Sequence, residues 1–205
     1  MIDLAQEGGI WTATINRPEK ANALTSAMLT RLVEIAEDAG QPSGARLLIL
    51  TGAGKVFSAG ADLDAMQDGL ATSPAWERLS SAIAALPCLS IAALNGTVAG
   101  GAMGMALACD FRVAVQGADT FYPVMKRGFL PQPSDPARLA ALVGPARARR
   151  ILLAGERLTA ETALDWGLYD RITAQDTLMD GTRDMAAEAL AATPQHVAAI
   201  KKLIP

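Results

Sequence analysis

The chain has 205 residues, of which 51% are hydrophobic and only 4% aromatic, and its formal net charge is −3. The 18 basic and 21 acidic residues are mixed along the chain, so no basic stripe predicts a nucleic-acid partner. Two cysteines without a C-x-x-C pattern, and one histidine, exclude a disulfide framework, a thiolate metal cluster and a multi-histidine metal site. This cysteine usage fits a reducing compartment, and we expect a cytoplasmic protein with no metal.

The sequence indicates neither a targeting signal nor a membrane span. Residues 1–7 lack the basic and apolar regions of a secretory signal. The uncharged stretch 79–109 is interrupted by Pro87, Asn95 and several glycines, whereas a bilayer helix needs about 20 continuous apolar residues. We therefore expect a buried strand, a turn and a buried helix there, and no membrane partner.

Predicted strands and helices alternate along the first half of the chain. Residues 10–15 alternate in polarity and predict a strand, and Thr25 then caps a helix that ends at Gly40. The apolar run 47–50 predicts a strand buried on both faces. After a glycine-rich loop, residues 74–85 predict a helix and residues 88–94 a second buried strand.

The second half becomes mostly helical. Residues 100–108 predict a short helix without charge, and residues 111–115 a third strand. From Ser134 onward the pattern is helical, with a break at 168–172 that is consistent with one more strand. Such alternation is typical of an α/β fold, and no linker rich in proline, serine or charge divides the chain. We predict a single domain over residues 1–205, with a core over 1–130 and a mostly helical segment over 131–205.

Two glycine-rich loops each follow a buried strand and lead toward a helix. The first, 51–63, contains Gly54-Lys55, but Ile49 and Val56 stand where a phosphate-binding P-loop needs glycine and Ser or Thr. The second, 95–104, does not fit the G-x-G-x-x-G pattern of dinucleotide-binding proteins. Two such loops can each aim one backbone N–H at a shared point, which an oxyanion hole requires. Close packing of a helix on the sheet is the other reading of these glycines.

Four motifs occur in order along the chain. They are Asn16-Arg17-Pro18-Glu19-Lys20-Ala21-Asn22-Ala23-Leu24, then Phe57-Ser58-Ala59-Gly60-Ala61-Asp62-Leu63, then Asn95-Gly96 with Ala99-Gly100-Gly101, and finally Ala108-Cys109-Asp110. In order and spacing they resemble the enoyl-CoA hydratase/isomerase (crotonase) superfamily, and Leu153-Ala154-Gly155-Glu156 continues the resemblance. The resemblance implies a crotonase-like ββα spiral core, followed by a mainly helical part with shortened terminal helices.

The resemblance also implies that the chain binds an acyl-CoA thioester and stabilises its enolate. Coenzyme A would enter as part of the substrate, with no permanently bound cofactor. By position, the backbone N–H groups of Ala61 and Gly101 would form the oxyanion hole. The other expected substrate-binding residues are Lys20, Ala21, Ala23, Ala59, Gly60, Asp62, Leu63, Val98, Gly100, Gly104, Pro123, Val124 and Gln132. Lys20 has an alternative role as a solvated charge on a loop. The alternative role for Asp62 is structural, since its side chain can fix its own loop by local hydrogen bonds.

Two carboxylates that the family's hydratases use are absent. At those positions this chain has Gly104 and Val124, and Gln132 follows a proline where other relatives place an acid or a tyrosine. A neutral amide is no general base at neutral pH. Asp135 is the best remaining candidate catalytic carboxylate, although Ser134-Asp135-Pro136 also fits the start of a helix, with Asp135 as its cap.

We therefore predict an acyl-CoA enzyme of the lyase or isomerase type, in fatty acid metabolism, that is not an efficient hydratase. Decarboxylation and thioester hydrolysis assisted by Asp135 are the reactions left open. The alternative is a non-catalytic acyl-CoA-binding or assembly protein. A serine protease of the related ClpP type is disfavoured because His196 is badly placed. Relatives usually continue with helices that build a trimer, and we expect a homotrimer or hexamer here.

Overall fold

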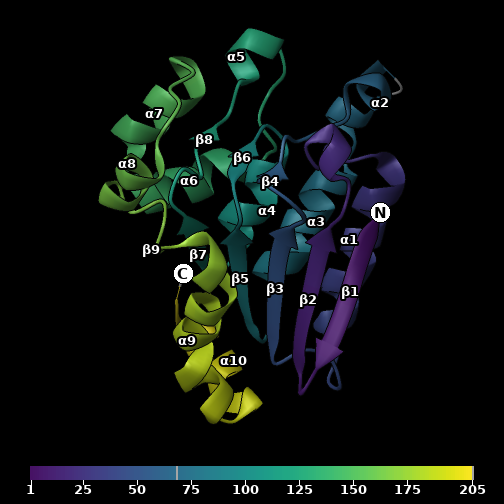
Figure 1. The fold of residues 1–205 in the computed structure, drawn as a ribbon, viewed down its shortest axis with the longest axis vertical. Coiled ribbons are helices and arrows are strands. Elements are labelled where there is room, and N and C mark those ends of the chain that lie inside the picture. Colours follow the sequence, from purple (N-terminus) through teal and green to yellow (C-terminus); the bar gives the residue numbers. More distant parts are fainter. Residues whose placement is uncertain (68, 205) are drawn as a thin grey trace.

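The computed structural model describes residues 1–67 and 69–204, and two sheets of mainly parallel strands dominate it (Figure 1). The larger sheet has the strand order β1-β2-β3-β5-β7-β9, and the smaller has the order β4-β6-β8. In the larger sheet β1 pairs antiparallel with β2, and the remaining pairs are parallel. The strands are β1 (Ile2–Glu7), β2 (Ile10–Ile15), β3 (Leu47–Gly52), β4 (Val56–Ser58), β5 (Leu89–Leu94), β6 (Thr97–Ala99), β7 (Phe111–Val115), β8 (Thr120–Phe121) and β9 (Arg171–Thr173).

A repeated strand–strand–helix unit builds both sheets. In three successive units the first strand (β3, β5, β7) joins the larger sheet, the second (β4, β6, β8) joins the smaller one, and helical residues follow. Because parallel neighbours need a crossover connection, each unit advances both sheets by one strand. This architecture is the ββα spiral that the motifs predicted.

Helices cover the larger sheet and connect its strands. Helix α1 packs on α3 and on the β1–β2 hairpin, and α9 packs on β5 and β7. The helices are α1 (Ser26–Ala39), α2 (Leu63–Gln67), α3 (Ala75–Ala84), α4 (Ala102–Ala108), α5 (Val124–Arg127), α6 (Asp135–Val143), α7 (Pro145–Leu153), α8 (Ala160–Asp165), α9 (Leu178–Ala191) and α10 (Pro194–Leu203).

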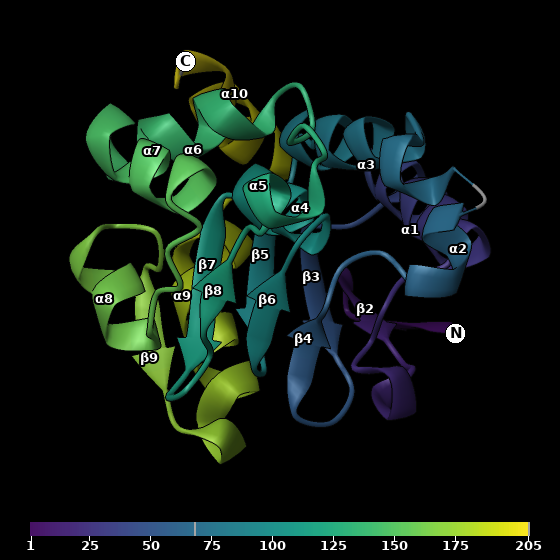
Figure 2. The same ribbon diagram turned by 90° about the horizontal axis from the view of Figure 1, so that it is seen from above.

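The carboxyl ends of β2, β3 and β5 point to the end of the larger sheet at which β4, β6 and α5 lie (Figure 1). Viewed from above, the three strands of the smaller sheet lie side by side at this end (Figure 2). Ligands of open α/β proteins bind outside the carboxyl ends of the parallel strands. This end of the molecule is therefore the place to look for a site.

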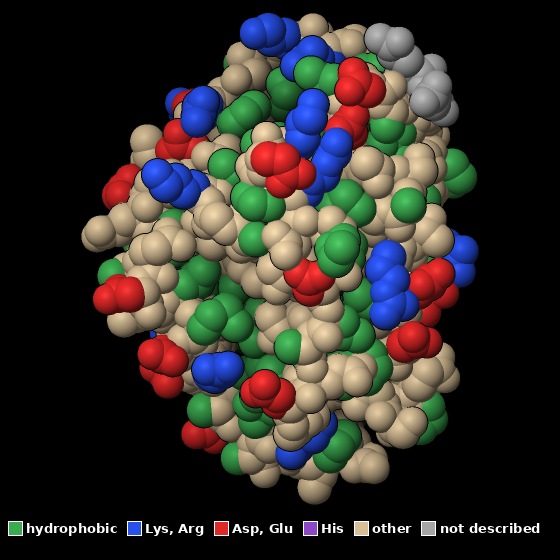
Figure 3. Space-filling view, turned by 45° about the vertical axis from the view of Figure 1, so that its right-hand side comes forward, with side chains coloured by type: hydrophobic (Ala, Val, Ile, Leu, Met, Phe, Trp, Pro, Cys, Tyr) green, Lys and Arg blue, Asp and Glu red, His purple; other side chains and the backbone are tan. Residues whose placement is uncertain are grey.

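The core explains why the central strands are uninterrupted apolar runs. β3 and β5 are buried along almost their whole length, as expected for strands that are covered on both faces. Ile49 and Ile91 pair across these strands, and both are completely buried. The outer surface is charged instead, and Figure 3 shows acidic and basic side chains interspersed over one face. Within the described residues, no helix combines the length and hydrophobicity that a bilayer span requires.

Several short elements lie where the sequence predicted loops. β4, β6 and β8 have only two or three residues each, too few to show a period of two, and β1, α2 and α5 were also missed. The strand predicted at 168–172 is shifted, because β9 begins at Arg171. Leu168 and Tyr169, whose hydrophobicity suggested that strand, instead close the end of α8 by donating to the carbonyl of Ala163.

Candidate active site

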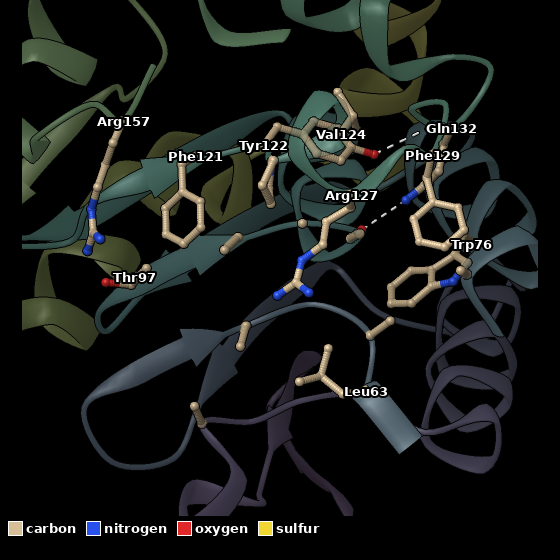
Figure 4. A pocket seen from close by; sticks show the side chains of 18 of the residues that line it. Leu63, Trp76, Thr97, Phe121, Tyr122, Val124, Arg127, Phe129, Gln132 and Arg157 are labelled. Atoms are coloured by element: carbon tan, nitrogen blue, oxygen red, sulfur yellow. Dashed lines mark hydrogen bonds between the residues drawn. The ribbon is translucent and has the colours of Figure 1, made fainter. Parts of the chain in front are cut away.

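A cavity of about 430 Å³ opens beside the smaller sheet, and both glycine-rich loops form part of its wall (Figure 4). Ala59 and Ala61 come from the loop after β4, and Gly100 and Gly101 from the loop after β6. Residues of the segment 121–132 form the other side. Most lining residues are small or apolar, so a polar group on this wall stands out as a candidate for chemistry.

The two loops touch at a pair of glycines. Gly60 has a φ of 93° and Gly100 a φ of 57°, a region that other residues rarely adopt. A Cβ on Gly60 would lie 2.8 Å from the carbonyl oxygen of Ala99 and 3.0 Å from the nitrogen of Gly101. A side chain at position 60 would therefore force the loops apart, and glycine is required for their contact.

The N–H groups of Ala61 and Gly101 have no acceptor among the described residues. One neighbour of each is satisfied, since Asp62 N–H donates to Leu24 O at 2.9 Å and Gly100 N–H donates to Phe121 O at 3.2 Å. Native proteins pair nearly all backbone donors that are away from water. Two unpaired N–H groups on the wall of one cavity are suited to hold an oxygen that carries negative charge.

Two buried asparagines hold the turn between β3 and β4, which is the first part of the glycine-rich loop 51–63. Asn22 Nδ2 donates to Ala53 O at 2.9 Å and to Val56 O at 2.6 Å, and Asn95 Nδ2 donates to Gly54 O at 2.9 Å. Asn22 has a φ of 54°, which asparagine tolerates better than most residues. Both side chains belong to the sequence motifs, and their contacts position the loop.

Asp62 also anchors the first loop. Its Oδ1 accepts hydrogen bonds from the N–H groups of Asp64 and Ala65 at 3.0 and 3.3 Å, and its Oδ2 forms an ion pair with Arg17. The hydrogen bond from Arg17 lowers the pKa of the Asp62 carboxyl below its ordinary value. Asp62 does not line the cavity, so its contacts fit the loop-fixing alternative rather than contact with substrate.

Beside the second loop, Gln132 occupies the space that a side chain at position 104 would need. A Cβ on Gly104 would lie only 2.4 Å from Gln132 Oε1. Gln132 Nε2 donates to the carbonyl oxygen of Gly101 at 2.9 Å, so its amide is held against the second loop (Figure 4). Val124 lines the cavity as well, and no described lining residue is an aspartate or glutamate. The described part of the wall therefore offers no carboxylate as a general base.

Asp135 is completely buried and does not line the cavity. Its Oδ2 accepts a hydrogen bond from the Tyr122 hydroxyl at 2.8 Å, and that hydroxyl accepts one from Gln132 N–H at 3.4 Å (Figure 4). Burial raises the pKa of the Asp135 carboxyl to about 6, although the Tyr122 hydrogen bond opposes this. The alternative interpretation of Asp135 as a helix cap is wrong. The N-cap of α6 is Ser134, Asp135 is the first residue inside the helix, and no side chain caps this end by a hydrogen bond.

The structure brings most of the predicted site residues together and leaves some outside. Lys20 is exposed, Ala23 is half-buried, Val98 lies within buried β6, and Gly60 and Gly104 shape the wall from behind. The residues predicted for the site that do line the cavity are Ala21, Ala59, Ala61, Leu63, Gly100, Gly101, Pro123, Val124 and Gln132. Those that do not are Lys20, Ala23, Gly60, Asp62, Val98, Gly104 and Asp135.

Sequence reasoning missed several lining residues. Trp76 packs beneath the second loop, with ring carbons 3.1 Å from where a Cβ on Gly101 would lie. Arg127, Phe129 and Arg157 also line the cavity. These side chains come from separate segments of the chain, and no local pattern in the sequence marked any of them. Only the tertiary structure assembles them.

Comparisons with known proteins agree with this architecture. The family model described as enoyl-CoA hydratase/isomerase matches residues 5–204. YngF from Bacillus subtilis, which carries that same description, is 37% identical over 187 residues, 88% of this chain and 72% of its own length. The carnitinyl-CoA dehydratase of Escherichia coli K12 is 34% identical over 207 residues, 98% of this chain and 79% of its own length. An enoyl-CoA hydratase structure from Mycobacterium avium subsp. paratuberculosis K-10 superposes with a TM-score of 0.91 at 32% identity, covering 99% of this chain and 83% of that one.

Proposed function

Because the chain belongs to the enoyl-CoA hydratase/isomerase family, we propose that it is an enzyme that binds an acyl-CoA thioester and stabilises the thioester enolate. The observation that carries this proposal is the pair of unpaired N–H groups of Ala61 and Gly101 on one cavity wall. In the enolate the thioester carbonyl oxygen gains negative charge, and both N–H groups can donate to it. One such donor is worth about 10²–10³ in rate.

The missing carboxylates favour decarboxylation over hydration. Hydration needs a base to activate water and an acid to protonate the α-carbon, and the described cavity wall has neither Asp nor Glu. In decarboxylation of a 2-carboxyacyl thioester, such as malonyl-CoA, the electrons of the breaking bond between the α-carbon and the carboxylate form the enolate as CO2 leaves. The α-carbon then takes a proton from water. Thioester hydrolysis assisted by Asp135 has less support, because that carboxyl is buried behind Tyr122.

A non-catalytic acyl-CoA-binding protein is the second candidate, and the same lack of carboxylates favours it. Turnover of malonyl-, crotonyl-, 3-enoyl- and 3-hydroxyacyl-CoA, measured beside a binding titration of each thioester, separates the two candidates. We expect CO2 release from malonyl-CoA and slow or undetectable hydration of crotonyl-CoA. Binding without any turnover would support the second candidate, and absence of binding would contradict both.

We also propose that copies of the chain assemble as a trimer or a dimer of trimers. Large apolar side chains are exposed outside the cavity, for example Leu153 at the end of α7, which is 63% accessible. Exposed apolar surface of this kind is commonly covered by a partner. Sedimentation at micromolar concentration should show an oligomer, and a stable monomer would contradict this expectation.

A further inference from the structure

The only charges on the described wall of the cavity are positive. Arg127 and Arg157 both line it, and no described lining residue is an aspartate or a glutamate. This contrasts with the whole chain, whose formal net charge is −3. Both arginines are exposed and therefore partly screened by water, but a guanidinium without a counter-charge beside a mainly apolar wall still favours an anionic ligand.

Arg157 is already balanced by its neighbours. Its Nε lies 2.8 Å from Oδ2 of Asp119, and its guanidinium carbon lies 4.9 Å from the centre of the Phe121 ring. The ion pair neutralises the charge of Arg157, and the aromatic ring occupies one face of its guanidinium. Arg157 therefore has little unsatisfied charge to offer to a ligand.

Arg127 is different, because it has no ion-pair partner in residues 1–67 and 69–204. It is the last residue of α5, where its N–H donates to Pro123 O at 3.0 Å and Gly128 ends the helix with a φ of 70°. Its side chain extends from α5 toward Leu63, so its guanidinium lies between the two sides of the cavity (Figure 4). The backbone of Arg127 is thus fixed, while none of its five side-chain N–H donors has an acceptor among the described residues.

The position of Arg127 indicates which part of a thioester it would meet. It lies one helical turn after Val124 in α5, and both residues line the cavity that Ala61 and Gly101 also line. A carbonyl held by those two N–H groups places its own acyl group in this cavity. The phosphates of coenzyme A are separated from the thioester by the whole pantetheine arm. An anion beside Arg127 therefore belongs more naturally to the acyl group than to the nucleotide.

We propose that Arg127 is a specificity-determining residue for acyl groups that end in a carboxylate. A guanidinium binds a carboxylate through two parallel N–H···O bonds, and such charged pairs are stronger than neutral hydrogen bonds. The substrate class is then a short dicarboxylic acid joined to coenzyme A through one of its carboxyl groups. This inference rests on the proposed function, since it names the substrates of the same site.

Calorimetric titration of the full chain tests this assignment. The probes are malonyl-, succinyl- and glutaryl-CoA, each compared with the monocarboxylic acyl-CoA of equal carbon number, together with free coenzyme A. The variants are Arg127→Met, which keeps the length of the side chain and removes its charge, and Arg127→Lys, which keeps the charge. Arg149→Met is the matched control, because Arg149 is exposed on α7 and does not line the cavity.

We expect the wild-type chain to bind at least one dicarboxylic thioester about 10-fold to 100-fold more tightly than its monocarboxylic counterpart. Arg127→Met should abolish this preference, Arg127→Lys should keep part of it, and Arg149→Met should leave it intact. Equal affinities within all three pairs would overturn the inference and leave the proposed function standing. Equal weakening of free coenzyme A and of every thioester by Arg127→Met would assign Arg127 to a phosphate instead. A wild-type chain that binds no thioester would contradict the proposed function itself.

Discussion

The two sides of the cavity are built from different parts of the polypeptide. The loops at 59–63 and 99–101 contribute backbone N–H groups, whose position depends on the contact between Gly60 and the second loop. The other side, which we call the side-chain wall, is the segment 121–132. There single side chains such as Val124 and Gln132 decide what chemistry is available. With Ala61 and Gly101 as the proposed oxyanion hole, this pair of donors can be kept while the acid and base groups change, because the two depend on separate features of the fold.

The largest effect should come from placing the two missing carboxylates back into the cavity, one at position 104 in α4 and one at position 124 in α5. The variant Gly104→Glu/Val124→Glu/Gln132→Gly puts a glutamate at both positions and removes the amide that fills the space beside Gly104. Each general acid or base is worth about 10²–10⁴ in rate, so crotonyl-CoA hydration should rise by at least that factor. The measurement is the loss of enoyl-thioester absorbance.

The matched control for this gain is the variant with glutamine instead of glutamate at positions 104 and 124, which should hydrate no faster than the wild type. A wild-type kcat for crotonyl-CoA above about 10 s⁻¹ would contradict the comparison, because another side chain would then have to supply the proton.

Removing one donor from the backbone side should have the next largest effect. Gly101 has a φ of −58°, which proline can adopt, so Gly101→Pro deletes the N–H with a compatible backbone at that residue. Turnover of the identified substrate should fall by about 10²–10³. Gly101→Ala is the control, since it keeps the N–H and adds a Cβ 3.1 Å from the Trp76 ring. If a folded Gly101→Pro protein, checked by circular dichroism, kept full activity, the oxyanion assignment would be wrong.

The same division explains what the sequence could predict. A site built from backbone N–H groups is visible in the sequence as glycines, because Gly60 and Gly100 must adopt positive φ angles and approach the facing loop closely. Asp135 shows the opposite case. The local pattern Ser134-Asp135-Pro136 resembles a helix start, whereas the real partner of Asp135 is Tyr122, 13 residues away. Arg127 likewise had no local signal, since its meaning depends on a cavity that only the folded chain forms.

Asp135 provides a stability test of the contacts behind the side-chain wall, because its carboxylate accepts a hydrogen bond from Tyr122. Its pKa is raised from 3.8 to about 6 by burial, so the folded state favours the protonated carboxyl. This stabilising contribution is complete below about pH 4, decreases as the pH rises through 6, and is absent above it. A difference of about two pKa units corresponds to about 3 kcal/mol. The Asp135→Asn variant cannot ionise, so its free energy of unfolding minus that of the wild type should be about 3 kcal/mol larger at pH 8 than at pH 4, which means that the variant is relatively more stable at the higher pH.

Urea unfolding of both proteins across this range of pH measures the difference. Asp165→Asn on the exposed face of α8 serves as the control and should change the free energy of unfolding little at any pH. A difference between Asp135→Asn and the wild type that is independent of pH would contradict the raised pKa.

The smallest expected effect connects the two sides directly. In Gly104→Ala the new Cβ would lie 2.4 Å from Gln132 Oε1, so the flexible amide must move and lose its bond to the Gly101 carbonyl. One hydrogen bond is worth about 1 kcal/mol, and if it holds Gly101 in place, turnover should slow by up to about tenfold. Alanine also favours the helical backbone of α4 by about 1 kcal/mol over glycine, so thermal stability should not fall in parallel.

Gln132→Met should slow turnover equally, and the double variant should be no slower than either single one, because both changes break the same contact. Additive losses in the double variant would mean that Gly104 and Gln132 act independently, and that the side-chain wall does not position the backbone donor.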